Sequence, residues 1–266
     1  MIDYHLHTRY SDGNADAEEY VKTAIEIGIQ EIGISDHFVI KPSGEQEKFS
    51  MKKDEVPEYI MTLTRLKKMY KGKISIKIGI EIDYFDENYE KVLDFLEIFP
   101  FDYYIVGIHS LNGKTIDVEE FGEEINSLED FEVYNVYKQF FETTVRAIYT
   151  RKFDILAHPD ILKRYVRRPN IDLTPLYQSV FKALKETHMT FEVNLSGLRH
   201  PVKEIYPDPS MLKFADKRNS IIISSDSHDV PTFRNTKRDE ARKLLRDMGF
   251  KKLAIFNRRK RMFKPL

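Results

Sequence analysis

The chain begins with MIDYHLHTRYSDG, residues 1–13, in which two histidines stand one residue apart and an aspartate follows. Residues i and i+2 of a β-strand point to the same side, so His5 and His7 are predicted to face one point. Together with Asp12 they form a geometry suited to a metal ion. An H-x-H pair alone is weak evidence, so this interpretation requires further ligands elsewhere in the chain.

The composition limits which ligands and partners are available. The 266 residues are 41% hydrophobic and carry 42 Lys+Arg against 43 Asp+Glu, a formal net charge of −1. This balance gives no global attraction to nucleic acid or to an anionic membrane. There is no cysteine, so any metal must be held by nitrogen and oxygen. No signal peptide or apolar run of about 18 residues is evident, which predicts a cytoplasmic protein without a membrane partner.

Short apolar runs alternate along the chain with stretches of helical period. The predicted strands cover residues 3–6, 31–35, 73–85, 102–110, 153–158, 190–196 and 220–228, with a last strand over 252–256. The predicted helices cover residues 16–27, 58–70, 86–97, 130–149, 175–186, 210–217 and 237–248. Seven or eight such units predict an α/β protein with a closed or nearly closed barrel, in a single domain over residues 1–266.

Potential metal ligands gather at the carboxyl ends of the predicted strands. These positions hold His5 and His7, Asp36 and His37, Glu81 and Asp83, His109, His158, Glu192 and Asn194, and Asp226 and His228. Of the eight histidines only His188 and His200 lie elsewhere. In α/β barrels the active site is built at this end of the strands, so the side chains are predicted to converge.

Each of these residues taken singly has an ordinary structural explanation. A lone strand-end histidine is more often a hydrogen-bonded core residue than a ligand, and a lone Asp36 is usually a cap or turn residue. Glu81 lies between two isoleucines in an apolar strand and therefore needs a cation or hydrogen-bond donors. Taken together, the set favours a cluster of two or three Zn²⁺, Fe²⁺ or Mn²⁺ ions, which would bind phosphate and supply hydroxide at neutral pH.

Six motifs occur in order between residues 5 and 228: HLHTRYSDG, SDH, GIEIDY, GIHS, AHPD and SSDSH. Together they resemble the polymerase and histidinol phosphatase (PHP) family. The resemblance implies a distorted (β/α)7 TIM-like barrel, the PHP fold, with a trinuclear metal centre. It assigns one ion to His5, His7, Glu81 and Asp226, a second to Glu81, His109 and His158, and a third to Asp12, His37 and His228. Some members have histidine in place of Asp12.

Further residues resemble the monofunctional histidinol-phosphate phosphatases of this family. The stretch VNLSGLRHPVKEIYPDP, residues 193–209, is similar to theirs, and Arg199 matches a phosphate-binding arginine. Arg164 is a second candidate for phosphate binding, because a guanidinium makes bidentate bonds to phosphate oxygens. A solvated loop arginine is the alternative at both positions. Asp160 and His228 are the candidate proton donors for the leaving group, although Asp160 could equally be a helix cap.

The resemblance implies a phosphate monoester hydrolase, with L-histidinol phosphate as the predicted substrate. We expect Asp83, Asp160, Glu192 or Asp229 to face the amine, and Tyr84 or Phe233 to flank the imidazole. The alternatives are a phosphoesterase for nucleotides, oligonucleotides or phosphotyrosine, a non-catalytic metal-stabilised module, and an amidohydrolase-type deaminase barrel. The basic stretch NRRKRMFK, residues 257–264, is predicted to be a solvated helix face or tail rather than a nucleic-acid patch.

Overall fold

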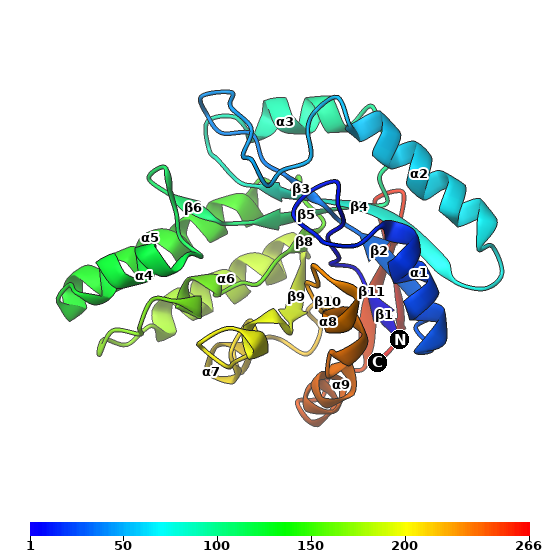
Figure 1. The fold of residues 1–266 in the computed structure, drawn as a ribbon. Helices are drawn as coiled ribbons and strands as arrows, with labels where there is room; N and C mark the ends of the chain where they lie inside the picture. The colour runs from blue at the N-terminus through cyan, green and yellow to red at the C-terminus, as the bar shows by residue number, and fades with distance from the viewer.

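The computed structural model describes residues 1–266 and shows a nearly closed barrel of parallel strands surrounded by helices (Figure 1). The strand order follows the chain: β1 (Ile2–Asp3), β2 (Glu31–Ile34), β4 (Ser75–Asp83), β5 (Tyr103–Gly107), β8 (Ile155–Leu156), β9 (Thr190–Asn194) and β10 (Ile221–Ser224). The short β3 (His37–Phe38) pairs beside β2 on β4. The first and last strands meet through a parallel bridge between Leu6 and Ser227. The predicted seven-stranded barrel is therefore confirmed.

Helices between successive strands cover the outside of the barrel (Figure 1). They are α1 (Ala17–Glu26), α2 (Val56–Met69), α3 (Tyr89–Leu96), α5 (Asp130–Tyr149), α6 (Thr174–Thr187) and α9 (Arg238–Asp247). In α1, Asp16 and Glu19 form a capping box at the start, and Val21 and Ala24 face the core. None of the helices combines the length and the apolar character needed to cross a membrane.

Several short elements lie in the loops between strands and helices. A tight turn joins β6 (Ser110–Leu111) to β7 (Lys114–Thr115), with Asn112 and Gly113 at positive φ as a two-residue hairpin requires. The sequence did not predict α4 (Glu119–Asn126) or α8 (Val230–Asn235), and α7 (Pro209–Leu212) is shorter than predicted. Two 3₁₀ turns, η1 (Ile161–Arg164) and η2 (Ser196–Arg199), follow β8 and β9 and carry the two candidate phosphate-binding arginines.

The basic C-terminal stretch forms a β-hairpin, so the prediction of a helix face or tail is wrong. The antiparallel strands β11 (Lys252–Asn257) and β12 (Lys260–Pro265) are joined by Arg258 and Arg259, both at positive φ. The guanidinium of Arg259 lies 3.8 Å from the ring centre of Tyr104, and the Arg259 amide donates to the carbonyl of Asp102. These contacts fix the hairpin turn against the amino end of β5. The two chain ends lie close together beside β1 and β11 (Figure 1).

The amino end of the barrel interior is filled by aromatic side chains. Tyr103 stacks on Tyr4 with ring centres 5.0 Å apart, and its hydroxyl donates to the Tyr4 carbonyl at 2.6 Å. The ring fits there because Gly33 and Gly79 face it: a Cβ atom on Gly79 would lie 2.2 Å from the Tyr103 Cζ. Packing of this density leaves no room for a larger residue at either glycine.

We expect Gly79→Ala to lower the free energy of unfolding by about 1–3 kcal/mol, the usual cost of overpacking a buried site. Urea denaturation measures the change. The control combines Gly79→Ala with Tyr103→Leu, which removes the ring. If the alanine costs as much in that background as in the wild type, then the clash with Tyr103 is not the cause.

Candidate metal centre

All nine predicted metal-binding residues come together at the carboxyl ends of the barrel strands. They are His5, His7 and Asp12 after β1, His37 on β3, Glu81 on β4, His109 after β5, His158 after β8, and Asp226 and His228 after β10. Several groups of three or four have possible ligand atoms within 4.8 Å of one another. The opening H-x-H pair is therefore one part of a larger cluster.

The carboxylate of Glu81 lies at the centre of the cluster. It is fully buried, on the longest strand of the barrel. Five imidazoles surround it: Oε2 is 3.1 Å from His5 Nε2, 2.9 Å from His37 Nδ1 and 3.5 Å from His7 Nε2, and Oε1 is 3.2 Å from His158 Nε2 and 3.8 Å from His109 Nε2. Its two oxygens thus face two different sets of histidines, as a bridging ligand would.

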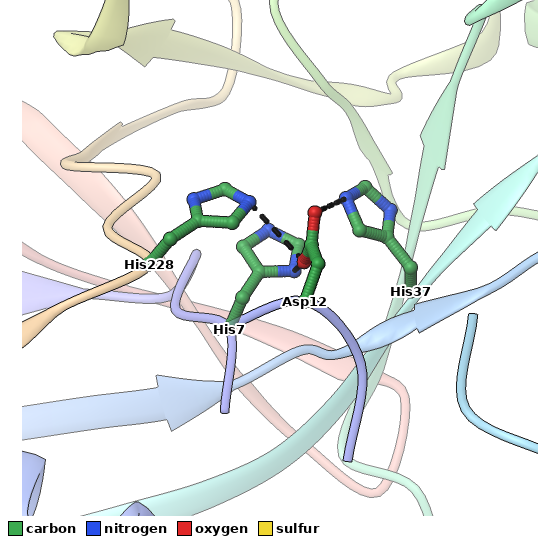
Figure 2. A group of neighbouring side chains, drawn as sticks. All are labelled: His7, Asp12, His37 and His228. Carbon is green, nitrogen blue, oxygen red and sulfur yellow. Dashed lines mark ion pairs between the residues drawn. The ribbon is translucent and has the colours of Figure 1, made fainter. Parts of the chain in front are cut away.

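A second group lies nearer the surface and is shown in Figure 2. Asp12 reaches three imidazoles: Oδ1 is 3.4 Å from His228 Nε2 and 3.9 Å from His7 Nδ1, and Oδ2 is 3.9 Å from His37 Nε2. The side chains of Asp12 and His228 are 34% and 35% exposed, whereas those of the Glu81 group are almost completely buried. The cluster therefore has an inner part and an outer part.

Two further carboxylates hold histidines from behind. Glu192 Oε1 lies 2.7 Å from His5 Nδ1, and Asp83 Oδ1 lies 2.6 Å from His109 Nδ1. When the Nδ1–H donates to such a carboxylate, the lone pair of Nε2 is directed into the cluster. Both carboxylates are buried and each is engaged by a histidine, so their contact with a substrate amine stays a prediction. The sequence indicated that both residues lie at strand ends. It did not indicate whether their side chains point into the cluster or to the outer nitrogen of a histidine.

The other predicted substrate contacts also have partners within the protein. Asp229 caps α8 by accepting from the Thr232 amide at 2.7 Å. Tyr84 is buried and donates to Asp86, and Phe233 is buried against Tyr20. These contacts contribute to the fold, and a role of the three side chains toward a substrate stays a prediction.

The electrostatics of the cluster keep its carboxylates ionised. Burial opposes the charge of Glu81, but the imidazoles of His5 and His37 outweigh that effect and hold its pKa well below the usual range. For His7, burial lowers the pKa to about 3, and His228 and His37 act in the same direction. The cluster therefore combines anionic oxygens with at least one neutral imidazole, as a metal site requires.

The residues present fit divalent cations. Several buried atoms of the cluster lack a hydrogen-bond partner: His5 Nε2, both ring nitrogens of His7, His37 Nδ1, Glu81 Oε2 and His158 Nδ1. Leaving so many buried polar atoms unsatisfied is costly, and bound cations would satisfy those that face the centre of the cluster. The donors are imidazole nitrogens and carboxylate oxygens, the set that suits Zn²⁺, Fe²⁺ or Mn²⁺. His158 and Asp226 also adopt positive φ, a strain found at functional sites.

The predicted phosphate-binding arginines lie at the rim of the cluster. Arg199 Nη2 donates to the carbonyl oxygens of Ser225 and Asp226, at 2.8 and 2.9 Å. Arg164 donates from Nη1 to Asp117 at 3.2 Å and from Nε to the Tyr206 hydroxyl at 3.4 Å. Neither is a freely solvated loop arginine, because both guanidinium groups are fixed by protein contacts.

Asp160 lies in a buried ion-pair network next to the cluster. Its Oδ2 accepts from Lys163 Nζ at 2.9 Å and from the Asp208 amide at 3.0 Å, and its Oδ1 has no partner. Burial raises its pKa to about 6 against the opposing charge of Lys163. The network joins η1 to the segment 204–208, a link between distant residues that the sequence did not indicate.

Comparison with known proteins identifies the family. The sequence pattern of the PHP domain matches residues 3–196, which is most of the chain. The chain belongs to the PHP family. Within this family it is similar to proteins named "Probable histidinol-phosphatase" from Deinococcus radiodurans and "Histidinol-phosphatase" from Bacillus subtilis. The first is 25% identical, covering 97% of this chain and 98% of that protein, and the second 26%, covering 86% and 93%.

The PHP fold is shared with solved structures. The crystal structure of histidinol phosphate phosphatase from Lactococcus lactis, complexed with zinc, L-histidinol and phosphate, superposes with a TM-score of 0.80. It covers 98% of each chain at 22% sequence identity. The resemblance that the six motifs suggested therefore extends over the whole barrel.

We expect the purified protein to contain divalent transition metal and Glu81→Gln to lose most of it, because the amide removes the charge that two groups of histidines share. Elemental analysis of the dialysed proteins measures this. Glu31→Gln is the matched control, since Glu31 is also buried but pairs with Tyr4 and Lys264 away from the cluster. Full metal retention in Glu81→Gln would contradict the central role of this carboxylate.

Proposed function

We propose that the chain is a metal-dependent phosphatase that hydrolyses L-histidinol phosphate to L-histidinol and phosphate, in histidine biosynthesis. The observation that carries the proposal is the pair of fixed arginines, Arg164 and Arg199, beside a buried cluster with metal-ligand chemistry. The similarity to proteins named histidinol-phosphatase over nearly the whole chain supports the choice of substrate. We further propose a single domain acting in the cytoplasm on a small molecule, without nucleic acid.

We propose two or three ions, held by the nine residues of the cluster. Glu81 would bridge the ion at His5, His7 and Asp226 to the ion at His109 and His158, and Asp12, His37 and His228 would hold the third. Bound divalent ions would neutralise phosphate oxygens and supply a hydroxide nucleophile at neutral pH. Glu192 and Asp83 contribute by holding His5 and His109 in one tautomer and one orientation.

The two arginines would bind the phosphate group of the substrate. Arg199 donates to carbonyl oxygens through Nη2 alone, so its Nε and Nη1 are free to donate to a phosphate. Those bonds also fix the guanidinium next to the main chain of Asp226, a proposed ligand. A phosphate that reaches the ions would therefore meet a pre-positioned donor, which is effective because nothing has to reorganise as charge develops.

The proposed proton donors for the leaving alkoxide are Asp160 and His228, and they differ in access. Asp160 is buried and engaged by Lys163 and Asp208, with only Oδ1 available. His228 is about one-third exposed and its Nε2 faces Asp12.

We expect Arg199→Ala to lose about 2–4 kcal/mol of transition-state stabilisation, the effect typical of one lost electrostatic donor. Measured kcat/KM for L-histidinol phosphate gives this value, and metal content should not change. Arg218→Ala is the control, because Arg218 pairs with Asp216 in an exposed ion pair away from the cluster. An Arg199→Ala protein with wild-type kcat/KM would rule out phosphate binding by this residue.

A panel of phosphate esters tests the substrate. We expect L-histidinol phosphate to have a higher kcat/KM than nucleotides, phosphotyrosine peptides or aryl phosphates, because a site with matching polar groups rejects analogues that leave them unpaired. Asp117 is the partly exposed carboxylate beside Arg164, so Asp117→Asn should reduce this preference by weakening attraction to the amine. If another ester is the better substrate, the proposed substrate is wrong, whereas the proposal of a metal-dependent phosphatase still stands.

A further inference from the structure

Asp36 is a buried carboxylate without a cation. Its side chain is fully buried, and no Lys or Arg pairs with it. Instead it accepts three hydrogen bonds: Oδ1 from the Thr8 amide and the Ser11 hydroxyl, both at 2.6 Å, and Oδ2 from the Thr8 hydroxyl at 2.8 Å. Burying a carboxylate is costly, and these three hydrogen bonds offset that cost while they fix the positions of their donors.

All three donors belong to the turn over residues 8–13, which carries Asp12. Within the turn, the amides of Ser11 and Gly13 both donate to the Thr8 carbonyl at 3.0 Å. The far end is fixed because the Asn14 amide donates to the His228 carbonyl at 2.6 Å. Asp36 thus anchors the near end of the turn, and the far end is bonded to the main chain of His228, another proposed metal-binding residue.

The side chain of Asp12 has little else to hold it. Its side chain is 34% exposed, and its ion-pair contacts are with the imidazoles of His7, His37 and His228. The turn itself is pressed against the strand: a Cβ atom on Gly13 would lie 2.2 Å from the His7 carbonyl oxygen. The position of Asp12 is therefore set by the backbone of the turn, and so by Asp36.

We propose that Asp36 is a positioning residue that sets the affinity of the outer metal site, formed by His7, Asp12, His37 and His228. This inference rests on the proposed metal centre. The outer ion is the exchangeable one, because two of its ligands are about one-third exposed and one of them, Asp12, lies on a turn whose near end is anchored by the Asp36 carboxylate. The inner sites lack this dependence, since their ligands stand on or directly after barrel strands.

The test is zinc binding by the purified holoenzyme and its variants. Each protein is dialysed against buffers of graded free Zn²⁺, and bound zinc is measured by elemental analysis. The wild type should lose one ion at a higher free Zn²⁺ than the others. We call each such loss of one ion a step. In Asp36→Ala the free Zn²⁺ concentration at which the outer ion is lost should rise by about 10–100-fold, the usual effect of losing a group that orients a ligand. The steps of the inner ions should stay at their wild-type concentrations.

Two further variants keep the test decisive. Ser11→Ala removes one of the three hydrogen bonds and should shift the outer step in the same direction by less, even if Asp36→Ala does not fold. Asp102→Ala is the matched control: Asp102 is also buried and accepts from two backbone amides, of Ile78 and Arg258, but at the amino end of the barrel. It should lower stability and leave all zinc steps unchanged.

The outcomes distinguish failure of the proposed metal centre from failure of the proposed role of Asp36. If the wild type binds no zinc or other divalent metal, the proposed metal centre fails and this inference with it. If the wild type shows inner and outer steps, but Asp36→Ala and Ser11→Ala move all of them equally or none, the metal centre stands and the role of Asp36 is overturned. The same holds if Asp102→Ala shifts the outer step as much as Asp36→Ala.

Discussion

The buried carboxylate of Glu81 is the constraint on which the arrangement of the barrel's carboxyl end depends. An anion at the centre of an apolar barrel is tolerated only when positive charge or hydrogen-bond donors surround it. Strands β1, β3, β5 and β8 are therefore followed by, or contain, histidines that face this one carboxylate. Because β4 pairs with neighbours on both sides, Glu81 reaches histidines from both halves of the barrel.

A second set of carboxylates holds the first set of ligands in place. Glu192 and Asp83 orient histidines, and Asp36 orients a turn. Asp3 acts at the barrel seam: it accepts from the Ser225 amide at 3.1 Å and pairs with Arg238 at 2.7 Å, just before the loop with Asp226 and His228. Each group fixes a ligand by a bond to the backbone or to the outer nitrogen of a ring, which restricts the cluster to one arrangement.

The two ends of the barrel have different tasks. The carboxyl end gathers ionisable groups that are expensive to bury, whereas the amino end is filled by Tyr4, Tyr103 and the C-terminal hairpin. The ring centre of the hairpin residue Phe256 lies 6.1 Å from that of Tyr103. Dense aromatic packing therefore lies beneath the polar cluster. In barrels of this kind, the amino end supplies stability and the carboxyl end function.

The sequence by itself determined the type of barrel and the members of the cluster. The alternation of strands and helices is a local property, and strand-end positions converge in any parallel barrel, so His5, His7 and Glu81 could be placed together from the sequence. Only the tertiary structure decided which carboxylates face inward and which lie behind a histidine. Asp83 and Glu192 resemble inward ligands in the sequence, yet each points to the outer nitrogen of a ring.

The same limit applies to the loops and to the C-terminus. The anchoring of Arg164 by Asp117 and the folding of residues 252–265 into a hairpin against β5 depend on contacts between residues far apart in the chain. Such contacts have no local signal, because the packing of the whole barrel sets them. Periodicity indicates which residues are buried together, whereas hydrogen-bond geometry, available only in three dimensions, decides what each polar side chain does there.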